Sequence, residues 1–443
     1  MDPQLMQLLY HTVQTYNILP VTSVCNVRCI FCSHRQNPPG IRAVSVPPLP
    51  FNIIKDLIGF LDKNRKIVIG ESASLIMEGE PFTHPQIIET LELIRHTYPR
   101  AIIQLTSNGS FFDEDLAKRL KEMEPLEINL SINIADLQLR ERLMNDKRAA
   151  IACKAPEVLS KYNIAFHGSI VAMPHVTGFD KLYETLKFLS DANAQTIRVF
   201  KPGFTKYTPQ NLLPGKDLLD ELDAKIKEWR ENLCLCPITF EPSLLSGLEA
   251  EVVGVIRNSP AEKAGIIKGD IIEAIDGKKP FSRVEAFKML QKNAQYNLGI
   301  NGKHGRCQTR LTVTNEKSGL VFDYDIPFSL LQDIQSIINR MKGEKLVLFS
   351  SKLGHKLLQE NFADIENLQV VPVKNLYFGG NIQCAGLLII NDFLAAFKLL
   401  FGDRGTPDVL ILPSIAFDKD GRDITGRGLW ELEELTGCQV VLI

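Results

Sequence analysis

The sequence lacks the features that mark membrane, secreted and nucleic-acid-binding proteins. Its 443 residues carry a formal net charge of -2, so no charge excess indicates a nucleic-acid or anionic-membrane partner. The N-terminus shows no basic region followed by an apolar core, and we expect no secretory signal. The most hydrophobic stretch, residues 385–401, contains Asn391, Asp392 and Lys398, so it fits a buried strand and helix better than a membrane span.

Internal repeats and low-complexity tracts are also absent. Hydrophobic residues make up 45% and charged residues 23% of the chain, as in ordinary globular proteins, and the length suggests about three domains. The nine cysteines are an odd number, which argues against a disulfide framework and favours a reducing, cytoplasmic location.

The first half of the chain alternates short apolar runs with amphipathic segments. Such alternation with short connections predicts parallel β/α units, here a partial (β/α)6 barrel over residues 1–240. Ligands bind at the carboxyl ends of the strands in such sheets. We expect strands at 18–24, 74–77, 101–106, 126–132, 165–171 and 196–200, and helices at 51–61, 84–96, 113–122 and 179–192.

Two smaller domains are predicted to follow. Residues 259–277, with glycines suited to turns at Gly265 and Gly269 and an Asp-Gly hairpin turn, resemble the PDZ fold of bacterial proteins. Ser282 followed by Glu285 predicts a capped helix over 283–291. We assign a small, mainly-β PDZ-like domain to 246–317 and an α/β domain to 318–443. In the latter we expect strands at 346–349, 370–373, 387–390, 409–412 and 440–443, and helices at 352–360, from Asp392, and at 429–435.

Three cysteines on the loop after the first expected strand carry the strongest chemical signal. Cys25, Cys29 and Cys32 are spaced C-x3-C-x2-C, and thiolate is the soft ligand that iron–sulfur chemistry requires. Three ligands can hold three irons of a four-iron cluster and leave one iron open for catalysis. With Phe31 before the last cysteine, the motif resembles that of the radical S-adenosylmethionine (SAM) superfamily.

Further motifs match that superfamily in type and order over about 200 residues. Its second strand usually ends in Gly-Gly-Glu-Pro, and the matching run here is Glu78 to Pro81, with Glu78 in place of the first glycine. Its third strand often ends in Thr-Asn-Gly, near Asn108 here. The resemblance implies a SAM pocket lined by Phe31, Gly79, Glu80, Pro81, Asn108, Ser131, Asn133 and Ile170, with Cys25, Cys29 and Cys32 on a [4Fe-4S] cluster.

The resemblance also reaches the C-terminal part. The runs from Asn375 to Gly380 and from Cys384 to Leu388 resemble an uncharacterised domain of bacterial iron–sulfur oxidoreductases that combine radical SAM and PDZ modules. That family places the PDZ segment first, whereas here it lies between the other two. The implied activity is reductive cleavage of SAM to a 5'-deoxyadenosyl radical that takes hydrogen from a substrate. An electron donor such as ferredoxin or flavodoxin is implied, and the subclass, oxidoreductase or transferase, stays open.

Several alternatives remain open at this level. Zinc could occupy the triad with His34 as a fourth ligand. Cys234 and Cys236 could hold an auxiliary cluster, although two free thiols fit better. Cys153, Cys307, Cys384 and Cys438 are expected to be packed core thiols.

Alternatives also remain open for the role of the PDZ-like module, for four polar side chains and for the function of the whole protein. The PDZ-like module could present a peptide or protein substrate, or could only cover the barrel. His167, His175, Arg198 and Lys201 could face the substrate or be structural. A peptide-binding or redox-sensing scaffold with a structural cluster is the competing function, and an RNA-modifying enzyme is disfavoured by the near-neutral charge.

Overall fold

A computed structural model describes residues 2–73, 75–232, 236–243, 247–303, 305–314, 317–402 and 405–443. The chain divides into two compact units. The first consists of Met1–Arg35, Ala43–Pro202 and Pro214–Thr239, and the second of Gln36–Arg42, Gly203–Leu213 and Phe240–Ile443. Domain boundaries near 240, 246 and 317 stay a prediction. Within the described ranges no helix is long and apolar enough to cross a membrane.

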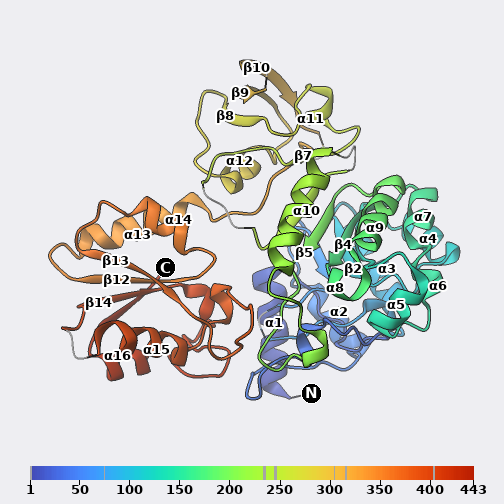
Figure 1. Cartoon of the computed structure of the whole chain (residues 1–443). Coiled ribbons are helices and arrows are strands. Elements are labelled where there is room, and N and C mark those ends of the chain that lie inside the picture. The colour runs from blue at the N-terminus through green and yellow to red at the C-terminus, as the bar shows by residue number, and fades with distance from the viewer. Residues whose placement is uncertain are drawn as a thin grey trace. The chain divides into compact units, whose positions relative to one another are not determined.

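A six-stranded sheet in the order β1-β2-β3-β4-β5-β6 organises the first unit (Figure 1). Neighbouring strands from β1 to β5 pair in parallel, which confirms the predicted α/β fold. The strands are β1 (Ile67–Ile69), β2 (Ile103–Ser107), β3 (Leu126–Ser131), β4 (Ala165–Val171), β5 (Ile197–Phe200) and β6 (Ile238–Glu241).

Helices follow most of these strands and cover one face of the sheet, as α3, α4, α7 and α9 do in Figure 1. They begin where capping residues allow; Asp113, for example, accepts a hydrogen bond from the Leu116 N–H at the start of α4. The helices are α1 (Pro3–Tyr16), α2 (Phe51–Ile58), α3 (Ile87–Thr97), α4 (Glu114–Lys121), α5 (Leu137–Met144), α6 (Ala149–Ala152), α7 (Ala155–Lys161), α8 (Pro174–Thr177), α9 (Phe179–Asp191) and α10 (Leu218–Asn232).

The two faces of this sheet differ in burial. Along β2 and β4 buried and half-buried residues alternate, because successive side chains of a strand point to opposite faces. The buried face packs under helices: a Cβ on Gly168 would lie 2.7 Å from Leu189 of α9. The other face, which carries Thr106, His167 and Ser169, stays partly accessible to solvent.

The first two expected strands are replaced by isolated bridges. Residues 18–24 pair with β1 only at Ile18, and the Ser23 N–H donates to the Val46 carbonyl. The expected strand at 74–77 forms bridges at Ile76, and Ser74 lies outside the described residues. β1 itself was not predicted. The early part of the barrel is therefore less regular than its hydrophobic pattern indicates.

The PDZ-like segment of the second unit has its own hydrophobic core, which includes Val252, Ile272 and Leu298. Ser282 caps α12 as predicted, and Asp276 and Gly277 both have positive φ in their turn. The elements are β7 (Gly254–Val255), α11 (Pro260–Lys263), β8 (Ile271–Ile275), α12 (Arg283–Met289), β9 (Gln295–Gly302), β10 (Gly305–Thr312) and β11 (Leu320–Val321), in sheets ordered β10-β9-β8 and β11-β7.

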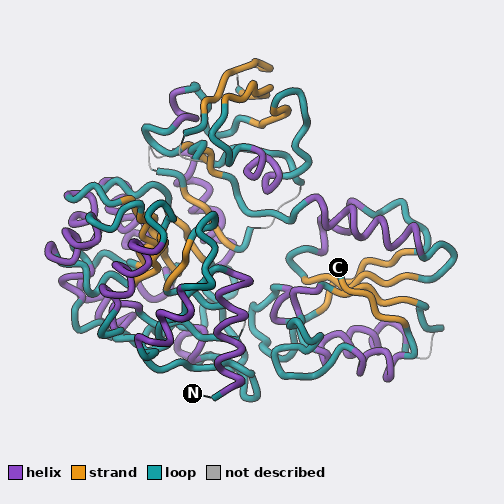
Figure 2. Tube along the Cα trace, turned by 180° about the vertical axis from the view of Figure 1, so that it is seen from behind, coloured by secondary structure: helices purple, strands orange, loops and turns teal. Residues whose placement is uncertain are grey.

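The C-terminal segment is a three-layer α/β sandwich. Figure 2 shows its strands as one layer between helices, and separate hydrophobic clusters fill the two faces. The parallel sheet has the order β13-β12-β14-β15. The elements are α13 (Phe328–Arg340), β12 (Leu346–Ser351), α14 (His355–Asn361), β13 (Leu368–Val373), α15 (Ile390–Phe401), β14 (Val409–Leu412), α16 (Trp430–Thr436) and β15 (Gln439–Leu442).

The expected strand at 387–390 is wrong. Asp392 accepts hydrogen bonds from the backbone N–H groups of Ile389 (3.1 Å) and Leu376 (2.9 Å), and this contact starts α15 at Ile390. A short 3-10 turn, Ala385–Leu387, precedes it. An apolar run alone could not distinguish the start of a buried helix from a strand.

Two segments that are early in the sequence belong to the second unit. Thr208 Oγ1 donates to Gln36 Oε1 (2.6 Å), and the Phe204 N–H donates to Asn381 Oδ1 (2.6 Å). Gly380 permits this approach, since a Cβ there would lie 1.9 Å from the Phe204 carbonyl oxygen. The loop after β13 therefore gathers residues that are more than 170 positions away in the chain.

Candidate active site

The cysteine loop, residues 25–32, is held by the last turn of α5. The backbone N–H groups of Arg28 and Ile30 donate to the carbonyls of Met144 (2.7 Å) and Leu143 (2.9 Å). Asn145 takes a left-handed conformation with φ of 49° and ends the helix there. The loop thus has a rigid support outside its own sequence.

The three thiols lie close enough to influence one another. Burial by the surrounding protein, together with smaller contributions from the charges of Cys25 and Cys32, raises the pKa of Cys29 to about 12. Burial also raises the pKa values of Cys25 and Cys32, while hydrogen bonds from the backbone at Val27 and His34 lower them. N–H donors to cysteine sulfur suit an iron–sulfur site, where such bonds tune the cluster.

The side chains around the loop bear on the alternative of a single zinc ion. Among the residues the structure describes, no three His, Cys, Asp or Glu side chains converge on one ion site. In a four-iron cluster each thiolate binds a different iron, so the sulfurs do not converge on one point. His34, the possible fourth zinc ligand, instead lies 3.4 Å from Glu78 through Nε2 and Oε2.

Asn108 connects the end of β2 to the cysteine loop. Its Nδ2 donates to Asn26 Oδ1 at 2.8 Å and lies 3.9 Å from Cys25 Sγ. Its Oδ1 accepts the Ser110 N–H at 2.9 Å. The residue is only 8% exposed, so these contacts fix the amide and bring a predicted site residue to the loop.

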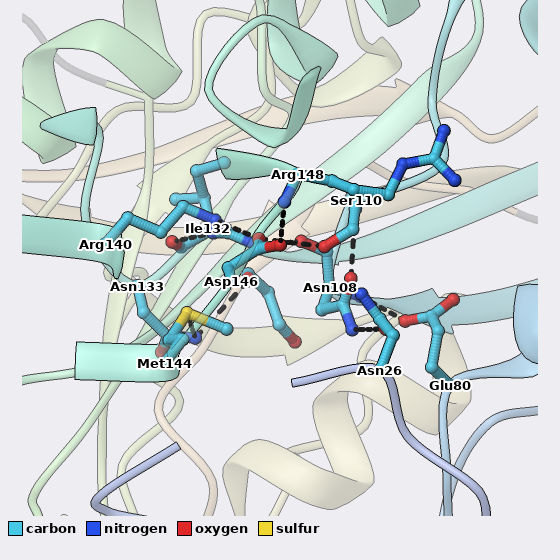
Figure 3. Close-up of polar contacts among 12 residues, drawn as sticks. Asn26, Glu80, Asn108, Ser110, Ile132, Asn133, Arg140, Met144, Asp146 and Arg148 are labelled. Atoms are coloured by element: carbon cyan, nitrogen blue, oxygen red, sulfur yellow. Dashed lines mark hydrogen bonds and ion pairs between the residues drawn. The ribbon is translucent and has the colours of Figure 1, made fainter. Parts of the chain in front are cut away.

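A fully buried ion pair lies behind these residues (Figure 3). Arg140 Nε donates to Asp146 Oδ2 at 2.8 Å, and both side chains are 0% exposed. The same guanidinium donates to the carbonyls of Ile132 (2.6 Å) and Asn108, and the Asp146 carboxylate also accepts from Ser110 Oγ (2.8 Å). The pair therefore joins α5 to the ends of β2 and β3. The positive charge of Arg140 favours the thiolate of Cys29.

The Gly-Glu-Pro run is held mainly by protein contacts. The Glu80 carboxylate accepts from Ser107 Oγ (2.8 Å), the Asn108 N–H (2.7 Å) and the Phe82 N–H (3.3 Å), which leaves it 2% exposed. Burial raises the pKa of Glu80 to about 7 despite these bonds. A Cβ on Gly79 would lie 2.2 Å from the Val24 carbonyl oxygen. The close approach of the backbone just before the cysteines thus requires a glycine at position 79.

The remaining predicted pocket residues lie in different surroundings. Ser131 is half-buried on the accessible face of β3, and Phe31 is half-buried in the loop. Asn133 is 6% exposed, with a positive φ, and its Oδ1 accepts the Val171 N–H at 2.8 Å. Ile170 is fully buried on the helix-covered face of β4, away from Ser131.

The basic side chains and the cysteines outside the triad, which the sequence also offered as candidates, have the following contacts and exposure. Lys201 forms an ion pair with Asp223 (2.7 Å), and His167 Nδ1 lies 2.7 Å from Thr196 Oγ1. Cys234 lies outside the described residues, and Cys236 is buried. All eight described cysteines are free thiols. The prediction of packed thiols is wrong for two of them, since Cys307 and Cys384 are exposed.

Sequence reasoning missed the residues behind the loop. Arg140, Asp146 and Ser110 belong to no short motif, and they meet only because β2, β3 and α5 end at the same edge of the sheet. The one available signal was Asn145-Asp146, a pair typical of helix ends and turns.

Comparison with known proteins agrees with this geometry. Residues 19–189 match the model of the Radical SAM superfamily, and residues 251–296 match that of the PDZ domain. Residues 19–189 therefore form a radical SAM domain. Superfamily membership indicates an enzyme, and enzymes of this superfamily use a [4Fe-4S] cluster and SAM, so both predicted cofactors are confirmed at that level.

Individual relatives match only parts of the chain. The FeMo cofactor biosynthesis protein NifB of Chlorobaculum tepidum is 27% identical over 135 residues, which cover 28% of this chain and 30% of that protein. The GTP 3',8-cyclase of Microcystis aeruginosa is 28% identical over 123 residues, 28% of this chain and 36% of that enzyme. The chain thus spans about a third of the length of these curated relatives.

Among solved structures, SuiB of Streptococcus suis bound to precursor peptide SuiA has 16% sequence identity and a TM-score of 0.39. The match covers 51% of this chain and 48% of that one.

Proposed function

We propose that this chain is a radical SAM enzyme in which Cys25, Cys29 and Cys32 ligate a [4Fe-4S] cluster. The observation that carries the proposal is the support of the cysteine loop, whose backbone is bonded to the end of α5 and whose Cys25 adjoins Asn108. When bound and reduced, the cluster with SAM supplies a carbon radical able to remove hydrogen from an unreactive C–H bond.

The residues of the chain have distinct roles in this proposal. The thiols must lose their protons to bind iron, which the charge of Arg140 favours at Cys29. Asn108, the backbone at Gly79 to Pro81, and Ser131 on the accessible face would line the SAM site. Glu80 and Asn133 keep the strand ends in place through their buried hydrogen bonds. Phe31 and Ile170 remain predicted residues of the SAM pocket, and no contact in the structure supports that role for either of them.

The decisive experiment uses full-length protein that is purified and reconstituted without oxygen. We expect about four irons per chain and formation of 5'-deoxyadenosine after addition of SAM and dithionite. Cys29→Ala should abolish both, because a cluster cannot form on two ligands. Cys307→Ala is the matched control, since this thiol is exposed and lies in β10, and it should retain both signals.

A full cluster that forms no deoxyadenosine in the presence of SAM and reductant would contradict the proposal. That result would favour the redox-sensing or peptide-binding scaffold. Iron clearly above four that survives Cys29→Ala would direct attention to Cys234 and Cys236.

The proposal also covers the substrate class, the electron donor and the cellular location of the enzyme. A peptide or protein substrate is supported by the PDZ match, because such domains bind extended peptides by strand addition. A ferredoxin or flavodoxin as the electron donor and a cytoplasmic location belong to the same proposal. We expect binding of a C-terminal peptide to be independent of iron content, which isothermal titration of apo and reconstituted protein would test.

A further inference from the structure

A carboxylate that the cofactor motifs do not use lies just after β1. Glu71 Oε1 accepts three hydrogen bonds, from Thr106 Oγ1 (2.9 Å), Gln104 Nε2 (3.1 Å) and Asn129 Nδ2 (3.1 Å). The second oxygen, Oε2, accepts no hydrogen bond from any residue that the structure describes. One oxygen is therefore anchored, and the other is available.

The three donors come from one face of the sheet. Gln104 and Thr106 alternate with buried Ile103 and Leu105 along β2, and Thr106 is in register with Asn129 on β3. Each donor is half-buried, as is Glu71. This face is thus less completely covered than the helix-packed face, and part of the carboxylate group's surroundings stays accessible to solvent.

This group lies next to the proposed cofactor site. Thr106 immediately precedes Ser107 and Asn108, which bind Glu80 at the end of β2. Asn129 precedes Ser131 by two residues on the same face, about 7 Å along the strand. The carboxylate is thus bonded to side chains one layer below the strand ends, on the face that also carries Ser131.

The charges around Glu71 indicate what it would bind. Its three partners are neutral amides and a hydroxyl, and no cationic side chain in the described chain forms an ion pair with it. Glu127, on the same face, differs in this respect, because Lys66 Nζ lies 2.7 Å from its Oε2. A half-buried carboxylate that lacks a cation is stabilised by a cationic ligand, and such charge-assisted bonds are the strong ones.

We propose that Glu71 binds a protonated amine or guanidinium group of the substrate through Oε2. The assignment rests on the proposed function, since it takes the accessible face of the sheet as the substrate site. It narrows the substrate to molecules that carry such a cationic nitrogen, which includes peptides with lysine or arginine side chains.

The test measures binding of small probes to reconstituted full-length protein with SAM. The probes are n-butylguanidinium, n-butylammonium and, as the neutral control of similar size, n-pentanol, followed by saturation-transfer NMR. At least one cation should bind, and n-pentanol should not. Glu71→Gln keeps the shape and the anchored oxygen but removes the charge, so it should weaken cation binding by roughly tenfold or more. Glu127→Gln, whose carboxylate already has Lys66, should bind as the wild type does.

Equal binding of cations and n-pentanol, no binding of either cation, or unchanged binding in Glu71→Gln would overturn the inference. The comparison of charged and neutral probes needs only wild-type protein, so a poorly folded variant does not prevent a decision. Deoxyadenosine is measured in the same samples without probes. Its absence contradicts the proposed function, whereas its presence without charge-selective binding contradicts only the assignment of Glu71.

Discussion

Removal of the Arg140 guanidinium should loosen the cysteine loop. Arg140→Met preserves most of the side-chain volume but leaves Asp146 as a buried carboxylate without its cation, and leaves the Asn108 and Ile132 carbonyls without their donor. Breaking a buried ion pair by removing one partner costs about 3–5 kcal/mol. The remaining donors to Asp146, Ser110 Oγ and the Arg148 N–H, keep the cost from rising further.

Hydrogen exchange gives a local measure of this loss. The Arg28 and Ile30 amides, which donate to the end of α5, should exchange roughly two to four orders of magnitude faster in Arg140→Met if local opening carries the full cost. Iron retained after reconstitution should fall in parallel. Arg142→Met is the matched control, because Arg142 is exposed on the same helix, and its effect should stay within about 0.5 kcal/mol.

A second variant separates the ion pair from the carbonyl contacts. If the charge pair alone mattered, Arg140→Met combined with Asp146→Leu would restore most of the stability, as buried pairs often tolerate apolar replacement. We expect incomplete recovery, because the two strand-end carbonyls stay unpaired. Exchange rates in Arg140→Met equal to those in Arg142→Met would refute the reasoning.

Three further predictions follow from the site and the second unit. Gly79→Ala should lower iron loading because its Cβ meets the Val24 carbonyl, whereas Gly215→Ala, with open space around it, should not; iron per chain decides. The pKa of Glu80 is raised to about 7 from its ordinary 4.5, so its stability contribution is present below pH 4.5 and is lost as pH rises through 7. The free energy of unfolding from urea denaturation should fall between pH 5 and pH 7, and this fall should be smaller by about 2 kcal/mol in Glu80→Gln; an unchanged fall would contradict this. Gly380→Ala should speed proteolysis within 203–213 more than Gly437→Ala does, since both have positive φ but only the former meets backbone.

Much of the fold could be predicted because hydrophobic periodicity dominates regular elements. β4 and β14 have the expected bounds, and Ser282 begins its helix where the capping pattern indicates. The strand expected at 387–390 could not be predicted correctly, because the apolar pattern does not show that the Asp392 carboxylate binds backbone at both ends of the preceding loop, at Leu376 and Ile389.

Only those site residues that belong to a short sequence motif could be predicted. The cysteines and the Gly-Glu-Pro run could be found by spacing, whereas no local pattern distinguishes Arg140 from Arg142 two residues later. Glu71 gave no signal either, since its partners lie 33 to 58 positions away and meet it only through parallel strand pairing. Tertiary placement determines these roles.

The membership of residues 36–42 in the second unit affects folding during synthesis. Tyr377 Oη donates to the Pro39 carbonyl across 338 positions at 2.7 Å. At about 5–20 residues per second, a ribosome needs roughly 20–70 s to make the chain between these partners. Residues 36–42 must therefore wait for nearly the whole polypeptide before these contacts form. Until then residues 36–42 of a nascent chain lack these partners, so chaperones can reach this segment while the rest of the chain is made.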